Sequence, residues 1–178
     1  EERKAPVKQE DLWLDIGAKD RTETLSLVRV GDPVTLQLGY QPLRNRLANA
    51  PGMDNRTGLW VVIEAFRRAS QRSLNWALYG VSTVQEEIGL RGATTSAYEC
   101  NPHAGIAVDV GHATDFPNCD LRKFGHFRLN AGPILHRGAN INPVVGKGLI
   151  STAKKKRIPY QMEAAPRGTG TGSDALQL

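Results

Sequence analysis

From about residue 50 onward the sequence alternates between helix-like and strand-like segments. Four apolar residues recur at the spacing of one helix face and predict a helix over 56–70: Leu59, Val62, Ile63 and Phe66. Aromatic and β-branched residues over 76–83 are typical of a strand. The same reasoning predicts helices over 93–98 and 144–157, and strands over 105–110 and 158–162. Alternating strands and helices indicate an α/β fold, with a mostly parallel sheet that has helices on both faces.

The first 45 residues have a different pattern. Segments 11–16 and 33–38 alternate polar and apolar side chains, as half-buried strands do. Between them, 22–28 predicts one or two helical turns, and the residues Gly31-Asp32-Pro33 predict a turn. The sequence therefore predicts a small β-rich element at 1–45, separate from the α/β region at 46–178.

Carboxylates stand at three element ends in the α/β region. Asp54 precedes the first helix, Glu86 and Glu87 follow the 76–83 strand, and Asp109 lies near the end of the 105–110 strand. The carboxyl ends of parallel strands are where ligands and catalytic groups collect. A carboxylate that closes an apolar strand is costly to desolvate unless it is paired or bound to a metal. The recurrence favours a shared cation.

Each carboxylate also has a purely structural explanation. Asp54 could be a helix N-cap, a role that Asp often fills. Glu86 and Glu87 could lie in the first turn of the next helix, where the helix dipole favours negative charge. Asp109 could end its strand at the surface. The individual residues leave these alternatives open.

The net charge of +5 raises the possibility of a nucleic-acid-binding protein. Much of this charge lies in 154–157, at the end of a predicted helix, where cations complement the helix dipole. The chain lacks the interleaved aromatic and basic residues of an RNA-binding sheet. We therefore predict no nucleic-acid partner.

The apolar runs and the cysteines indicate which further classes of protein can be excluded. No apolar run approaches the roughly 20 residues that a membrane-spanning helix needs. Cys100 and Cys119 are too few for a disulfide scaffold and lack the spacing of a zinc ribbon, so we expect reduced thiols. The chain begins with Glu1 rather than Met, and Asp174 to Leu178 starts an apolar segment. We expect a cytoplasmic protein with no membrane association, and a chain that is a piece of a longer one.

Four motifs together resemble the glutamyl and deblocking aminopeptidases, metallopeptidases that build tetrahedral dodecamers and are sometimes labelled endoglucanases. The motifs are Met53–Gly58, Gln85–Ala93, Ile106–Val110 and Gly172–Ala175. The run Gln-Glu-Glu-x-Gly-x-Arg-Gly-Ala is highly specific, and the similarity covers essentially the whole chain. It implies a zinc-exopeptidase-like three-layer sandwich, with 1–45 as part of an inserted dimerisation domain and 46–178 as a partial catalytic domain. An endoglucanase would instead need an acid and a base that flank a sugar.

The resemblance also implies an activity and a site. The family removes N-terminal residues from peptides with water activated by two divalent metal ions, zinc or cobalt. By this resemblance Asp54 would bridge the metals, Glu87 and Asp109 would each complete the shell of one metal, and Glu86 would be the general base. The peptide bond between Asp54 and Asn55 would be cis. Peptide substrates and a homo-oligomer, up to the dodecamer, would be the partners of the full-length protein.

Two histidine ligands of the family pattern have no counterpart here. One precedes the inserted domain and the other follows the Gly-Thr-Asp loop, in which Ser173 takes the place of Thr. We expect none of the four histidines to substitute as a ligand, although His112 should lie near the cleft: His103, His112, His126 and His136. Because zinc usually needs nitrogen or sulfur ligands, the chain alone should be inactive.

Because the two histidine ligands are missing, a non-catalytic structural or assembly fragment is the alternative to an enzyme. Residues 168–173 are rich in glycine, but they lack the Gly-Lys-Ser/Thr ending of a phosphate-binding loop. We predict a flexible loop near the active site there.

Overall fold

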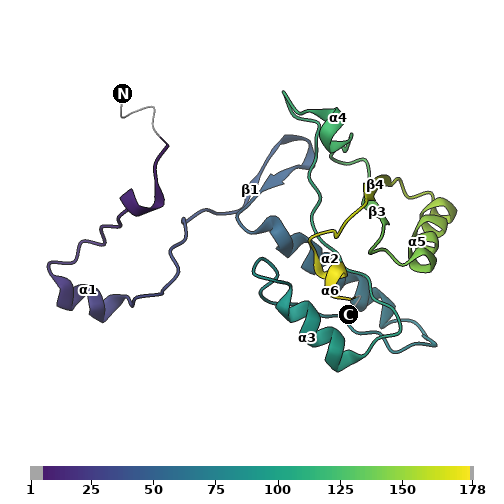
Figure 1. The fold of residues 1–178 in the computed structure, drawn as a ribbon, viewed down its shortest axis with the longest axis horizontal. Helices are drawn as coiled ribbons and strands as arrows, with labels where there is room; N and C mark the ends of the chain where they lie inside the picture. The colour runs from purple at the N-terminus through teal and green to yellow at the C-terminus, as the bar shows by residue number, and fades with distance from the viewer. Residues whose placement is uncertain (1–5, 177–178) are drawn as a thin grey trace. The chain divides into compact units, whose positions relative to one another are not determined.

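A computed structural model describes residues 6–176. The chain divides into two units between Gly39 and Tyr40 (Figure 1). Together they expose 15957 Å², whereas a folded monomer of 19.5 kDa exposes about 8,500 Å². Much of the apolar surface is therefore uncovered.

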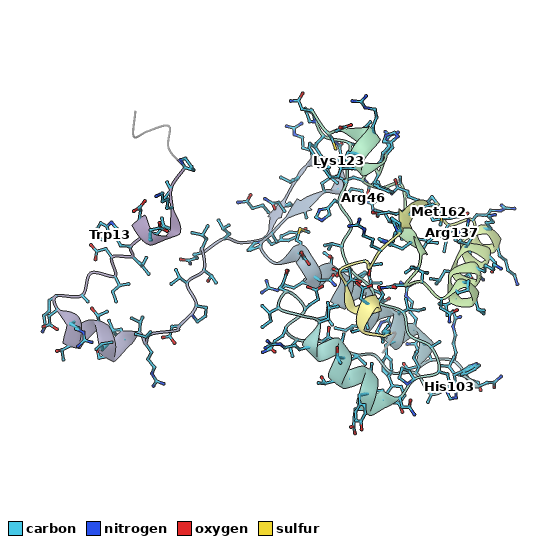
Figure 2. The ribbon with its side chains drawn as sticks, viewed as in Figure 1. Trp13, Arg46, His103, Lys123, Arg137 and Met162 are labelled. Carbon is cyan, nitrogen blue, oxygen red and sulfur yellow. The ribbon has the colours of Figure 1, made fainter. Side chains whose placement is uncertain are left out.

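The first unit contains a short 3₁₀ helix, η2 (Gln9–Asp11), and one α-helix, α1 (Arg21–Leu27). Asp20 caps α1, because its side chain accepts a hydrogen bond of 2.9 Å from the backbone N–H of Glu23. The helical turns predicted for 22–28 are thus confirmed. The strands predicted for 11–16 and 33–38 are wrong in the part of the chain described. An alternating pattern makes a strand only where a neighbour completes its hydrogen bonds, and Trp13 is 84% exposed instead (Figure 2).

The second unit begins with a short antiparallel pair, β1 (Gln41–Pro42) and β2 (Ala48–Asn49), around the 3₁₀ turn η3 (Arg44–Arg46). It continues with two longer helices, α2 (Met53–Ala69) and α3 (Arg91–Cys100). The remaining elements are α4 (Leu121–Phe124), β3 (Ile134–Gly138), α5 (Pro143–Lys156), β4 (Gln161–Ala165) and α6 (Gly172–Ala175). The helices predicted for 56–70, 93–98 and 144–157 are confirmed as α2, α3 and α5.

The longest strand pairing of the second unit is parallel. β3 and β4 run parallel in a register from Ile134 opposite Gln161 to Gly138 opposite Ala165. The helix α5 connects them and packs against β3. Its N-cap Asn142 accepts hydrogen bonds from Val144 N and Val145 N, which fixes where the helix begins. A strand–helix–strand unit with parallel strands is typical of the predicted α/β fold.

The structure corrects several predicted strands. Neither 76–83 nor 105–110 pairs with another strand within 6–176, and large apolar side chains of both are exposed, with Trp76 73% and Ile106 60% exposed. β3 was not predicted at all, and the strand predicted for 158–162 lies at Gln161–Ala165. The helices follow from local capping and periodicity, whereas a strand depends on a partner distant in sequence.

No helix among the described residues is long and apolar enough to cross a membrane.

The β3–β4 pairing predicts a sharp difference between two glycine substitutions. A Cβ built on Gly138 would fall on the carbonyl oxygen of Ala165 in the neighbouring strand, whereas one built on Gly148 in α5 meets nothing within 4 Å. In the full-length protein, we expect Gly138→Ala to lower the free energy of unfolding by about 1–3 kcal/mol through overpacking. Gly148→Ala should be neutral or stabilise by up to about 1 kcal/mol. Chemical denaturation measures both, and equal effects would contradict the register.

Candidate metal centre

A cavity of about 2260 Å³ in the second unit gathers the four predicted carboxylates. Asp54 at the start of α2, Glu86 and Glu87 before α3, and Asp109 from the 105–110 segment all line it. The chain carries 23 lysines and arginines, yet none is among the described residues that line this cavity. The cavity is therefore strongly acidic inside a basic protein.

Asn55 ties two of the carboxylate-bearing segments together. Its Nδ2 donates a hydrogen bond of 2.8 Å to the carbonyl of Val108, the residue before Asp109. Its Oδ1 accepts a hydrogen bond of 3.0 Å from the backbone N–H of Gly58. The bond from Gly58 is the contact that an N-cap makes three residues into a helix, so Asn55 fills that role for the regular part of α2. Asp54 is thereby left to line the cavity.

The backbone around Asp54 is irregular, as the family resemblance implies. The peptide bond between Asp54 and Asn55 is cis, which confirms that prediction. Both residues have non-helical backbone angles, and Gly52 is the capping residue of α2. The N-cap explanation for Asp54 is therefore wrong.

A tight turn presents Glu86 and Glu87 to the cavity. The backbone N–H groups of Gly89 and Leu90 both donate to the carbonyl of Glu86, at 3.1 and 3.0 Å. Gly89 has a φ of 119°, a conformation that favours glycine. Because α3 begins only at Arg91, the two glutamates do not lie in its first turn. The helix-start explanation for them is wrong as well.

Charge and burial act together on Glu86. Partial burial raises the pKa of the Glu86 carboxyl above its usual range, and the nearby charges of Asp109, Glu87 and Asp54 raise it further. The other three carboxylates are thus close enough to Glu86 to repel its negative charge. Asp109 is half-buried and its Oδ1 accepts from the N–H of Val110, so it does not simply end a strand at the surface.

The donor set suits a divalent cation but is incomplete for zinc. Carboxylate oxygens are ligands for divalent ions, and four of them without a basic partner leave uncompensated charge that a cation would neutralise. Zinc usually also takes nitrogen or sulfur ligands. Within residues 6–176 no three His, Cys, Asp or Glu side chains converge at ligand distance. The roles of individual carboxylates therefore stay predictions.

Three of the four histidines also line the cavity. His112 does so as predicted, together with His103 and His136, whereas His126 is exposed and is not part of the lining. His136 and Glu163 are register partners on β3 and β4, and their Nε2 and Oε2 atoms lie 3.7 Å apart. The Nδ1 atom of His136 is buried and has no hydrogen-bond partner among residues 6–176. Sequence reasoning missed this pair because it did not predict β3.

The glycine-rich loop lies at the cavity, as the sequence predicted. Thr169, Thr171 and Ser173 line it together with the carboxylates. Cys100 and Cys119 are both free thiols, which confirms the prediction for them.

Comparison with known proteins identifies the family. The profile of the M42 glutamyl aminopeptidases matches residues 1–178. The chain belongs to the M42 family. The lysyl aminopeptidase of Pyrococcus furiosus is 35% identical over 97% of this chain and 49% of its own length.

Solved structures of similar proteins confirm the α/β fold. The TET aminopeptidase of Thaumarchaeota archaeon SCGC AB-539-E09 has a TM-score of 0.80 and 30% identity, over 97% of this chain and 50% of that one. PhTET1-12s, a dodecamer in the asymmetric unit, has a TM-score of 0.72 and 26% identity, over 99% of this chain and 52% of that one. The chain spans about half the length of the M42 relatives it matches.

The Asn55 link predicts different effects for two substitutions in the full-length protein. Asn55→Ala removes both hydrogen bonds, so amide exchange should accelerate at Gly58 and across 105–111, by about fivefold or more for each lost bond of about 1 kcal/mol. Asn55→Asp keeps an acceptor for Gly58 N but loses the donor to Val108. It should loosen 105–111 and leave Gly58 protected. Hydrogen exchange read by mass spectrometry or NMR tests this, and unchanged exchange in 105–111 for both variants would show that the link carries no stability.

Proposed function

We propose that the full-length protein is a metal-dependent aminopeptidase that hydrolyses N-terminal residues from peptides. The observation that supports this most directly is the convergence of four carboxylates, from three separate segments, on one cavity whose described lining has no lysine or arginine. Membership of the M42 family supports the reaction class. Two relatives, named lysyl aminopeptidase and glutamyl aminopeptidase, belong to the same class of enzyme by name.

Three carboxylates would hold two divalent ions, zinc or cobalt. We assign Asp54 as the bridging ligand and Glu87 and Asp109 as the ligands of one ion each. When bound, such ions polarise a carbonyl group and lower the pKa of water. The turn at Glu86 and the Asn55 link would hold these side chains in place before any ion binds. Further ligands would come from other parts of the full-length protein.

Glu86 would be the general base. Its carboxyl is half-buried, and burial raises its pKa, which brings its basicity closer to that needed for proton transfer near neutral pH. In this role it takes a proton from the attacking water and delivers it to the leaving amine. The neighbouring Glu87 can serve as a ligand at the same time, because the residues lie in an irregular turn and not in a helix.

We propose that the full-length protein is a homo-oligomer whose substrates are peptides. The similarity to PhTET1-12s, a dodecamer, supports an oligomer. We further propose that residues 1–45 belong to the inserted dimerisation domain. A cytoplasmic location and the absence of a nucleic-acid partner remain predictions. A non-catalytic assembly module is the second candidate, and it would bind no metal and hydrolyse no peptide.

Substitution of Glu86 separates metal binding from turnover. In the full-length protein, Glu86→Gln should keep its metal content and lower the rate of aminoacyl-anilide hydrolysis by about 10²–10⁴-fold, the usual contribution of a general base. Glu99→Gln, the same change on an exposed position of α3, should have no effect on either. Metal analysis and steady-state kinetics give the two readouts. Loss of metal in Glu86→Gln would contradict the division of roles between Glu86 and Glu87.

Chelation tests the metal dependence as a whole. A panel of aminoacyl-anilides should be hydrolysed by the full-length protein, and thorough chelation should abolish this activity. Zinc or cobalt should restore it, because chelation removes the metal ions and leaves the carboxylates in place to bind them again. Activity that survives chelation would overturn the metal mechanism. A protein that is inactive with either metal would favour the assembly module.

A further inference from the structure

The carboxylate of Asp174 accepts four hydrogen bonds beside the cavity-lining residues Thr169 to Thr171. Its Oδ1 accepts from Asn140 Nδ2 at 3.0 Å, from Thr169 N at 2.9 Å and from Thr169 Oγ1 at 3.0 Å. Its Oδ2 accepts from Gly170 N at 2.7 Å. The bonds from Asn140, then Thr169 and Gly170, lower the pKa of this carboxyl to about 2. Asp174 is therefore an ionised anchor whose two oxygens both accept hydrogen bonds.

This anchor joins the ends of two parallel strands. Asn140 follows β3, and Thr169 and Gly170 follow β4. Because the carboxyl ends of parallel strands meet at one edge of the sheet, a single carboxylate can reach both. Asp174 thus fixes the loop 168–173 relative to the sheet.

Three hydroxyls of this loop form a closed cluster. Thr169 Oγ1 lies 2.5 Å from Ser173 Oγ and 3.2 Å from Thr171 Oγ1. The distance between Thr171 Oγ1 and Ser173 Oγ is 3.3 Å. Each hydroxyl has one proton. Thr169 donates to Asp174 Oδ1, so we assign the proton of the short contact between Thr169 Oγ1 and Ser173 Oγ to Ser173. Thr171 Oγ1 lies within hydrogen-bond distance of both other hydroxyls, and either atom of each contact can be the donor.

The remaining lone pairs on Thr171 and Ser173 determine what the cluster can bind. With its proton directed to Thr169, Ser173 offers lone pairs to a ligand, and the hydroxyl of Thr171 can accept or donate. The backbone N–H groups of Thr171 and Ser173 point to hydroxyl oxygens within the cluster, at 3.4 and 3.5 Å. A group with N–H donors fits.

Packing places this cluster beside the carboxylates. A Cβ built on Gly172 would lie 3.6 Å from the Cβ of Ala93 and 3.8 Å from the Cβ of Ala107. Ala93 belongs to α3, which directly follows the turn of Glu86 and Glu87, and Ala107 lies two residues before Asp109. The helices α3 and α6 pack against each other, with Ala93 and Ala175 buried. The hydroxyls and the carboxylates therefore line adjoining parts of one cavity.

We propose that Thr171 and Ser173 form a subsite that accepts hydrogen bonds from N–H groups of the peptide substrate, and that Asp174 is its positioning residue. This inference rests on the proposed aminopeptidase function. The N–H donors belong either to the first residue of the peptide substrate or to the backbone amides of the substrate beyond the scissile bond. Asp174 contacts no substrate in this arrangement, because its oxygens are occupied by Asn140 and by the loop itself.

The test uses the full-length protein loaded with its metal, and two substrates, leucine p-nitroanilide and trileucine. Ser173→Ala and Thr171→Val should each raise KM about five- to tenfold, the effect of one hydrogen bond, with kcat changed less than twofold. Ser173→Thr keeps the hydroxyl and should behave as the unsubstituted protein. Ser151→Ala, on the exposed face of α5, is the matched control. Melting temperatures of Ser173→Thr and Ser151→Ala should stay within about 2 °C. Those of Ser173→Ala and Thr171→Val should fall by only a few degrees, because each variant loses about 1 kcal/mol of hydrogen bonding or helix capping.

Asp174→Asn tests the positioning role. It keeps the shape but places an amide donor against an N–H donor of the loop, so KM should rise at least about tenfold. A KM change with both substrates assigns the subsite to the first residue, and a change with trileucine alone assigns it to the amides beyond it. If Ser173→Ala and Thr171→Val leave both KM values unchanged while the control protein is active, the cluster is only structural and the inference fails. An unsubstituted protein that hydrolyses neither substrate would instead overturn the proposed function, and the subsite with it.

Discussion

The negative charge of three carboxylates around Glu86, with no lysine or arginine in the described cavity lining, is the constraint that shapes the site. Elsewhere the chain neutralises an acidic residue with arginine: on α2, Arg67 and Arg68 hydrogen-bond to Glu64 and hold its pKa at about 2. No such partner lies among the described lining residues of the cavity, and the pKa of Glu86 is shifted in the opposite direction. The chain has ample basic residues, so the difference lies in where they are placed. A site that leaves its negative charges uncompensated is one prepared for cations.

Neutral hydrogen bonds replace ion pairs as the supports of this site. Asn55 holds the start of α2 to Val108 with an amide group, and backbone amides hold the Glu86 turn. A Cβ on Gly92 would collide with the backbone of Val84, so the glycine allows α3 to start close against the segment that carries the glutamates. These supports add no positive charge that would compete with a bound cation. The specific run from Gln85 to Ala93 thus has a local structural reason as well as a chemical one.

The sequence predicted the parts of the structure that depend on nearby residues. Helices α2, α3 and α5 follow from apolar periodicity, with capping by Asn142 in the case of α5. The four carboxylates could be found because each stands at the end of such a pattern. The pairing of β3 with β4 could not, since it joins residues 27 positions apart, as Ile134 and Gln161 are. For the same reason the His136–Glu163 contact and the bond from Asn140 to Asp174 had no signal in the sequence alone.

The unpaired segments 76–83 and 105–110 lead directly into the site, so strand pairing and metal-site geometry are coupled. Glu86 and Glu87 follow the first, Asp109 lies in the second, and apolar side chains of both are exposed. Within 6–176 they are held only by contacts such as those of Asn55 with Val108 and of Gly92 with Val84. These contacts fix which cavity the carboxylates face, but not their final separations, and no three of the described ligand-type residues converge. Neighbouring strands would fix both segments along their length. Because the carboxylates follow or lie in these two segments, any strand that paired with them would also set the distances between the carboxylates.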